Sequence, residues 1–228
     1  MQPLPIEVVP SYPAPSWEAL AATLQSLQGA ARQFQVDIVD GQFVSATSWP
    51  FTAPDHLEAL NRLRDWTAVY ELEVDCMVME PQQYLTTLAD IGAKRIIVHY
   101  GSTERVADIL AHAAAYDYQL GLAFTNDVFS HEWDAIAALV PAVSYVQVMG
   151  IATVGAQGQP FDERTLTTVR TLRDAFPTLT IAVDGSVNAA TIPGLVAAGA
   201  NRLAPGSAVV AAADPRAAYR SLCALSSS

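Results

Sequence analysis

The sequence predicts a (β/α)8 TIM barrel of the α/β class. Short β-rich runs alternate with helical runs in eight units of nearly equal length, and the connections between them are short. Eight such units in 228 residues favour a closed barrel over an open doubly wound sheet. No GxGxxG motif follows the first predicted strand, which weakens the dinucleotide-binding alternative. Since no linker or shift in composition divides the chain, we expect one domain over residues 1–228.

Each predicted element follows from a local pattern. Apolar, β-branched runs predict strands at residues 6–10, 33–40, 67–78, 94–100, 118–124, 143–149, 179–184 and 202–206. Helical periodicity between and after these runs predicts helices at residues 16–28, 54–65, 81–91, 103–116, 130–140, 162–175, 188–199 and 213–224. Ser102, Ser130 and Asn188 are expected to cap helices, because their side chains accept hydrogen bonds from free backbone N–H groups. Gly92 and Gly199 stand where two helices should end.

The composition excludes several classes of protein. A hydrophobic share of 51% and a charged share of 15% argue against disorder. The net charge is -11 with 12 Lys and Arg, and no basic stripe is visible, so we expect no nucleic-acid partner. The sequence has no run of about 18 apolar residues, so it predicts no membrane span, and its first residues lack the pattern of a secretory signal. We therefore expect a soluble, cytoplasmic protein.

Acidic residues occupy predicted strands that should be almost wholly apolar, because a barrel strand is buried on both faces. Asp37, Asp75 and Asp184 lie near the carboxyl ends of the second, third and seventh predicted strands. If their faces line the barrel interior, the three carboxylates converge, and each must be paired, metal-bound or protonated. The alternative is that each meets an Arg or a backbone donor. We favour that alternative for Glu71 and Glu73, which lie nearer the amino end.

Glycine-containing loops follow the last three predicted strands, at residues 150–161, 185–188 and 206–208. In barrels, the loops after strands 7 and 8 often bind phosphate through backbone N–H groups, and glycine lets those groups approach a ligand closely. His99 ends the fourth predicted strand and faces the same mouth. It is either a hydrogen-bonded core residue or part of a site.

Several motifs, in order and spacing, resemble the ribulose-phosphate 3-epimerase family along nearly the whole chain. Residues 36–44 (VDIVDGQFV) resemble its strand 2 motif DVMDGHFV, and residues 155–161 resemble its PGFGGQxF loop. Shorter matches are Pro10-Ser11, Met77-Val78 with Pro81, Gly92-Ala93 through His99, Val183-Asp184-Gly185, and Gly199-Ala200 through Gly206-Ser207-Ala208. The resemblance implies a barrel of the ribulose-phosphate binding type.

The resemblance also implies a reaction and a set of site residues. The family inverts the carbon next to a ketone through an enediolate, and its two catalytic aspartates match Asp37 and Asp184. A divalent metal ion polarises the carbonyl. The substrate is a small phosphorylated sugar, and members form homo-oligomers. The matched substrate-binding and phosphate-binding residues are Ser11, Met77, His99, Met149, Gly155, Gly158, Gly185, Ser186, Gly206 and Ser207.

The metal site departs from the family pattern. Gln35 and Asp75 stand where the family has two histidine ligands. The remaining set of Gln35, Asp37, Asp75 and Asp184 offers only oxygen ligands, which suit Mg or Mn better than Zn. Without a metal, three close carboxylates repel, so one should take up a proton. A protonated acid beside an ionised one is still an acid/base pair, so a metal-free isomerase stays open.

Two further classes of function stay open. One is a barrel that binds sugar phosphates without turnover, although retention of Asp37 and Asp184 argues against it. The other is a lyase or synthase of the related phosphate-binding barrels. We rank it last, because the Asp-x-Lys-x-x-Asp pattern of the decarboxylase relatives is absent from residues 73–78.

Overall fold

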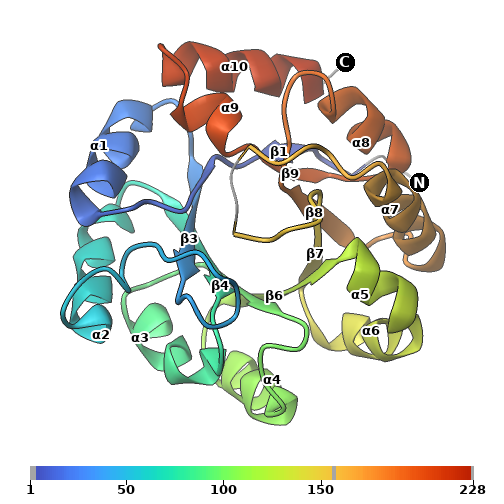
Figure 1. Ribbon diagram of the computed structural model, residues 1–228, viewed down its shortest axis with the longest axis horizontal. Coiled ribbons are helices and arrows are strands. Elements are labelled where there is room, and N and C mark those ends of the chain that lie inside the picture. The colour runs from blue at the N-terminus through green and yellow to red at the C-terminus, as the bar shows by residue number, and fades with distance from the viewer. Residues whose placement is uncertain (1–3, 156–157, 227–228) are drawn as a thin grey trace.

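The computed structural model describes residues 4–155 and 158–226. Its parallel strands form a ring, and the helices lie outside that ring (Figure 1). The strand order is β1-β9-β8-β7-β6-β5-β4-β3-β2. The strands are β1 (Glu7–Val8), β2 (Ser11–Tyr12), β3 (Gln33–Val39), β4 (Glu71–Met77), β5 (Arg95–His99), β6 (Gln119–Thr125), β7 (Tyr145–Met149), β8 (Thr180–Asp184) and β9 (Arg202–Ala204).

The ring closes through the first extended segment, which the structure divides into β1 and β2. β1 pairs with β9, and β2 pairs with β3. Pro10 separates the two pieces and has no N–H to donate, but its carbonyl accepts a hydrogen bond from Gln35 N at 2.9 Å. Because the two pieces are consecutive in the chain, they act as one strand position. The predicted closed barrel is confirmed.

The helices cover the outer face of the ring between successive strands (Figure 1). They are α1 (Trp17–Leu27), α2 (His56–Leu60), α3 (Leu85–Asp90), α4 (Val106–Ala115), α5 (Asn126–His131), α6 (Trp133–Leu139), α7 (Arg164–Ala175), α8 (Ile192–Ala198), α9 (Ser207–Val210) and α10 (Pro215–Ser226), with 3-10 turns η1 (Asn61–Trp66), η2 (Pro81–Gln83) and η3 (Val140–Ala142). None of these helices is long and apolar enough to cross a bilayer.

The predicted helix starts are wrong at three places, because the expected capping side chains bond elsewhere. Ser102 donates to the carbonyl of His99 at 2.7 Å, so it closes the turn after β5, and α4 begins later. Ser130 lies inside α5, whose cap is Thr125, an acceptor for Val128 N at 3.2 Å.

The third wrong start is that of α8. Asn188 accepts a hydrogen bond from Ala190 N at 2.9 Å in a turn that precedes the helix by several residues. The expected helix end at Gly199 is confirmed, since its positive φ of 109° is the left-handed conformation that glycine adopts freely.

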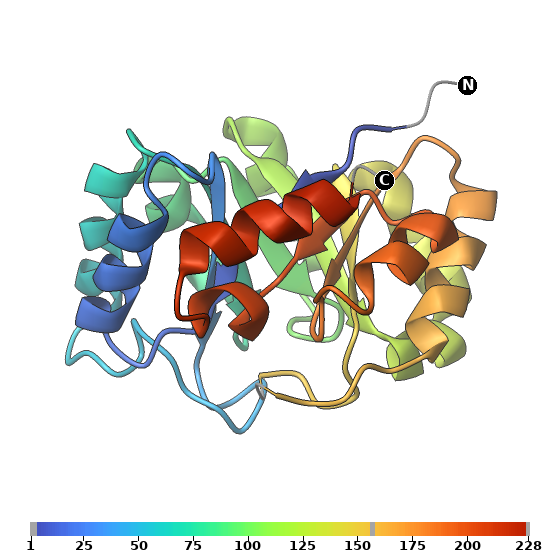
Figure 2. The same cartoon turned by 90° about the horizontal axis from the view of Figure 1, so that it is seen from above.

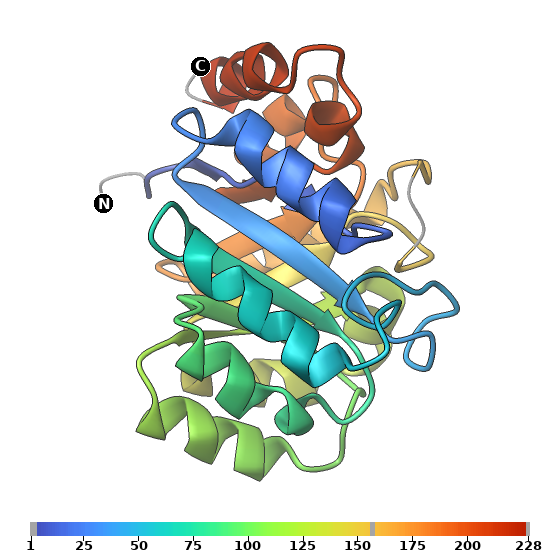
Figure 3. The same ribbon diagram turned by 90° about the vertical axis from the view of Figure 1, so that its left-hand side faces the viewer.

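The loops that follow the strands gather at one end of the barrel. The segments after β3 and after β7 extend from the same end, opposite the first described residues (Figures 2 and 3). Between strands and helices lies an apolar core, whereas the barrel interior holds many buried polar side chains. The carboxyl-end loops and these interior side chains together set the position of the site.

Candidate active site

Three buried carboxylates meet inside the barrel near its carboxyl end. They are Asp37 on β3, Asp75 on β4 and Asp184 on β8, and the β3–β4 register sets Asp37 beside Asp75. One oxygen of each lies within 4.8 Å of one oxygen of each of the others. The expected convergence is confirmed, and the spacing would let the three share one cation.

Gln35 lies between two of these carboxylates and is fully buried. Its Nε2 donates to Asp37 Oδ1 at 2.8 Å and to Asp184 Oδ2 at 2.6 Å. Its Oε1 has no hydrogen-bond partner among the described residues. The amide therefore turns its donor end toward the acids and leaves a buried acceptor unsatisfied, which is unfavourable by itself.

Asp75 contacts two other polar side chains. His99 Nε2 lies within hydrogen-bond distance of Asp75 Oδ1, at 2.8 Å. Gln147 Nε2 donates to Asp75 Oδ2 at 2.8 Å. Sequence reasoning missed Gln147, although a polar residue that shares a strand face with Tyr145 and Met149 in a buried strand is a usable signal.

The pKa values of the two aspartates beside Gln35 are raised. For Asp37, burial is the largest cause of the raised pKa, followed by the charges of Asp184 and Asp75, against the opposing hydrogen bond from Gln35. Burial and the charge of Asp75 raise the pKa of Asp184 to about 7, against the hydrogen bonds from Gln35 and from the Gly185 backbone. Near neutral pH the pair therefore keeps a proton, and Asp184 titrates in that range.

The two acids nearer the amino end have basic partners, as expected. Glu73 Oε2 accepts from Arg202 Nη2 at 2.8 Å and from the Tyr145 hydroxyl at 3.0 Å. Glu71 pairs with Arg32 at 2.5 Å and with Arg95 at 3.8 Å. These pairs neutralise the amino end of the interior, whereas amides and an imidazole surround the carboxylates at the other end.

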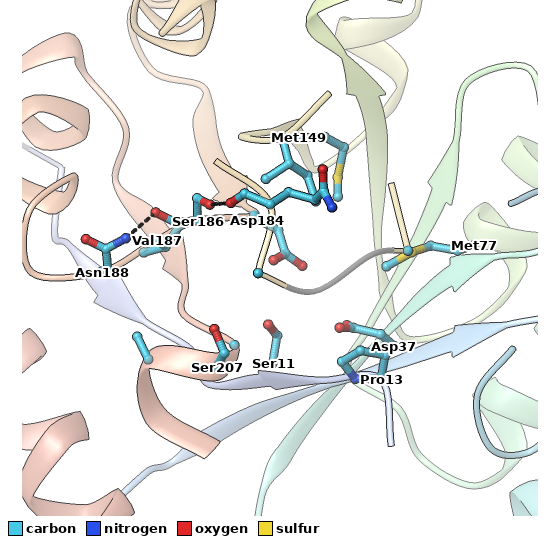
Figure 4. A pocket seen from close by; sticks show the side chains of 17 residues that line it. Ser11, Pro13, Asp37, Met77, Met149, Asp184, Ser186, Val187, Asn188 and Ser207 are labelled. Carbon is cyan, nitrogen blue, oxygen red and sulfur yellow. Dashed lines mark hydrogen bonds between the residues drawn. The ribbon is translucent and has the colours of Figure 1, made fainter. Parts of the chain in front are cut away.

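A cavity of about 390 Å³ opens above the carboxylates, and Asp37 and Asp184 point into it from different strands (Figure 4). Eleven predicted site residues line it: Ser11, Asp37, Met77, Met149, Gly155, Gly158, Asp184, Gly185, Ser186, Gly206 and Ser207. Gln35 and Asp75 are not among the lining residues but bond within the carboxylate network. His99 lines a neighbouring cavity of about 310 Å³ with Phe43.

Gln159 and Asn188 also line the main cavity; they lie in the predicted phosphate loops but were not among the predicted site residues. Among the described residues that line it there is no Lys or Arg, so a phosphate there would rely on backbone N–H groups and hydroxyls. Ser186 has a positive φ of 53°, and its hydroxyl donates to the carbonyl of Gln159. This contact fastens the loop after β7 to the loop after β8.

The loops after β3 and β7 also approach each other over the mouth. A Cβ added to Gly155 would lie 2.7 Å from Val44 Cγ2, so the backbone there comes too close for a side chain. Asp40 fixes the start of the β3 loop, because it accepts from Phe43 N at 2.9 Å and from Met79 N at 2.8 Å. The carboxylates thus lie under a mouth narrowed from two sides.

Comparisons with known proteins agree with this geometry. Residues 7–210 match the model of the ribulose-phosphate 3 epimerase family. Ribulose-phosphate 3-epimerase of Schizosaccharomyces pombe is 31% identical over 185 residues, which cover 79% of this chain and 75% of that protein. The cytoplasmic isoform of ribulose-phosphate 3-epimerase from Oryza sativa subsp. japonica is 30% identical over 213 residues, which cover 92% of this chain and 89% of that protein. The structure of 3-hexulose-6-phosphate synthase from Salmonella typhimurium matches with a TM-score of 0.74 at 15% identity, over 97% of this chain and 98% of that one. This likeness bears on the fold alone.

Proposed function

Because the chain belongs to the ribulose-phosphate 3-epimerase family, we propose that it inverts the carbon next to the ketone of a ketose phosphate. The observation that carries this proposal is the pair of buried aspartates, Asp37 and Asp184, at the floor of the mouth cavity. They come from strands far apart in the barrel, so a substrate carbon between them can exchange protons with both.

The proposed reaction is a proton transfer in two steps. The ionised aspartate takes the proton from the carbon next to the ketone, and the electron pair of that C–H bond forms the enediolate. The protonated aspartate then donates to the opposite face of the same carbon, and the ketone forms again. One proton is taken and one is given, so the pair ends with its protonation states exchanged. The raised pKa values of Asp37 and Asp184 suit this division of roles.

The cavity suits a small phosphorylated sugar. Met77 and Met149 supply apolar contact beside the two acids, and the phosphate would bind at the loops after β8 and β9, where Gly185, Ser186 and Ser207 lie. Since the described lining has no cationic side chain, contacts to the sugar together with backbone N–H groups and hydroxyls must supply most of the recognition. Cytoplasmic location and homo-oligomerisation belong to the same proposal, by likeness to the family.

The family resemblance implies a divalent metal ion, and the donor set tests that implication. The spacing of Asp37, Asp75 and Asp184 would admit one ion, and Mg or Mn is the class that carboxylate oxygens favour. However, Gln35 and Gln147 already donate to these carboxylates, and His99 Nε2 contacts Asp75 at 2.8 Å. Gln35 also turns its NH2 group, not its carbonyl oxygen, toward the acids. This arrangement does not fit a cation, so no step above passes through one.

Proton exchange tests the proposal directly. The protein is incubated with ribulose 5-phosphate in deuterium oxide, and NMR follows the carbon-bound proton next to the ketone. We expect that proton to exchange while the 3-epimer appears. Asp37→Asn and Asp184→Asn should each slow exchange by about 100-fold or more, because each removes one proton carrier. Asp134→Asn, which changes an exposed carboxylate on α6, serves as the control.

The alternative function is a barrel that binds sugar phosphates without turnover. The altered metal ligands, Gln35 and Asp75, are the observation that favours it. Tight calorimetric binding of ribulose 5-phosphate with no proton exchange would support this alternative. No exchange with any pentulose or hexulose phosphate would overturn the epimerase proposal.

A further inference from the structure

Gln35 makes a contact that the family resemblance does not account for. Its single amide nitrogen donates to both proposed catalytic acids, Asp37 at 2.8 Å and Asp184 at 2.6 Å. An amide NH2 group has two hydrogens, so these two acceptors use its whole donor capacity. The three side chains are buried, and the contact joins β3 to β8 across the interior.

The amide of Gln35 is oriented for donation to the carboxylates and not for binding a cation through its oxygen. The Oε1 atom of Gln35 is buried without a hydrogen-bond partner in the described part of the chain. Half a turn of the amide would offer Oε1 to a cation, but it would break both bonds and set a carbonyl oxygen against two carboxylates. Gln147 repeats the pattern: its Nε2 donates to Asp75 at 2.8 Å, and its Oε1 also lacks a partner there. The cluster is therefore built around N–H donors.

We propose that Gln35 is a positioning residue that holds Asp37 and Asp184 together in the place of a metal ion, so that the site works without one. The inference rests on the proposed epimerase function and adds how its two acids are kept close. A bridging donor shares the role of a bound cation in one respect: it attracts both carboxylates to one point. It differs in carrying no net charge, so one of the acids must keep a proton to limit their repulsion.

The first experiment measures metal binding without any activity. The wild-type protein is compared with the Gln35→His/Asp75→His double variant, which restores the two imidazoles that the resemblance implies. Both are analysed for bound metal after purification, and their thermal unfolding is followed with Mg²⁺, Mn²⁺ and Zn²⁺ and with chelator. We expect no stoichiometric metal and no shift in Tm for the wild type. The double variant should bind about one Zn²⁺ per chain and gain Tm with it.

The second experiment measures the positioning role by proton exchange. Gln35→Met removes the bridging donor and should lower kcat about tenfold or more, with little change in KM, because the lost hydrogen bonds act on the acids rather than on the substrate. It should also move the acid limb of the pH profile to higher pH, since that bond favours the ionised form. Gln33→Met is the matched control: it lies on the same strand, and its amide donates to Glu7 at 2.9 Å.

The outcomes separate this inference from the proposed function. Stoichiometric metal in the wild type, a rise of its Tm with any of the three ions, or exchange that stops with chelator would overturn the inference and leave the epimerase proposal standing. A Gln35→Met variant with the kcat and pH profile of Gln33→Met would also overturn it. Absence of exchange in the untreated wild type would instead overturn the proposed function. The metal measurements on the wild type need no folded variant.

Discussion

At the scale of single residues, the proposed chemistry depends on how the surroundings of Asp37 and Asp184 change the pKa of each side chain. Both lose hydration inside the barrel, which disfavours their charged forms. Asp37 feels the charges of Asp184 and Asp75 in addition to burial. Asp184 is also the acceptor of a backbone hydrogen bond from Gly185, which favours its ionised form. The net effect raises both pKa values, that of Asp184 to about 7 and that of Asp37 well above its usual range.

The pH dependence of turnover follows from these shifts. Below about pH 7, Asp184 is protonated and cannot take a proton, so kcat/KM should rise through that pH as it ionises. At higher pH, Asp37 loses its raised-pKa proton and can no longer donate, so kcat/KM should fall again. The measurement is kcat/KM for epimerisation from about pH 5 to about pH 9. A profile that is flat across the acidic half of this range would show that Asp184 has an ordinary carboxyl pKa.

Residue-level prediction from the sequence was strongest where strand alternation alone decides the outcome. Acidic residues on otherwise apolar predicted strands indicated that Asp37, Asp75 and Asp184 converge inside the barrel, and the structure confirms this convergence. Alternation gives the face of a side chain but neither its rotamer nor its partner. It could not show that Gln35 bridges two acids, or that His99 turns toward Asp75 and away from the main cavity.

At the scale of elements, the strands were predictable and the loops were not. Each predicted strand coincides with an observed one, because burial alone explains a short run of apolar residues in a barrel strand. The helix starts failed where the expected capping side chain bonds a different group. Ser130 donates to the carbonyl of Asp127, while Thr125 accepts from Val128 N and caps α5. The short helix α9 was not predicted, since four residues hold no helical period.

The contact between the loops after β7 and β8 gives a prediction at this scale. Gly150 N donates to Asp184 O at 2.6 Å, and a Cβ added to Gly150 would lie 2.3 Å from the carbonyl oxygen of Gly185. Gly150→Ala must therefore push the two loops apart beside the proposed phosphate site. We expect the Kd for ribulose 5-phosphate, measured by calorimetry, to rise about tenfold or more, because small displacements of binding groups are costly.

The matched control is Gly194→Ala in α8, where the nearest atom to the added Cβ is Leu166 Cδ2 at 3.6 Å. That distance is an ordinary contact, and alanine favours a helix interior, so Gly194→Ala should keep the wild-type affinity and lose no stability. Unchanged affinity in Gly150→Ala would show that the loop contact does not shape the binding site.

At the scale of the whole molecule, the barrel interior is polar at both ends but neutralised in different ways. Near the amino end, Arg202 on β9 bonds Glu73 on β4 and also Glu7 on β1. At the other end, amides and an imidazole face three carboxylates, and the described residues that line the cavity above include no Arg or Lys. The same closed ring thus holds stabilising ion pairs at its amino end and, at its other end, carboxylates that can still take up and release protons. The sequence could not pair Arg202 with Glu73, because the two lie 129 positions apart and only barrel closure joins them.

The amino-end network should be the part of the interior on which folding depends most. Arg202→Met leaves Glu73 buried without its cation, and breaking a buried pair in this way typically costs about 3–5 kcal/mol of unfolding free energy. Adding Glu73→Gln removes the stranded charge, so the double variant should recover most of that loss in urea unfolding. Arg32→Met removes an exposed partner of Glu71 and should cost less than about 1 kcal/mol. If Arg202→Met is as mild as Arg32→Met, the network is not what holds the amino end of the ring together, and the apolar core between strands and helices must do so alone.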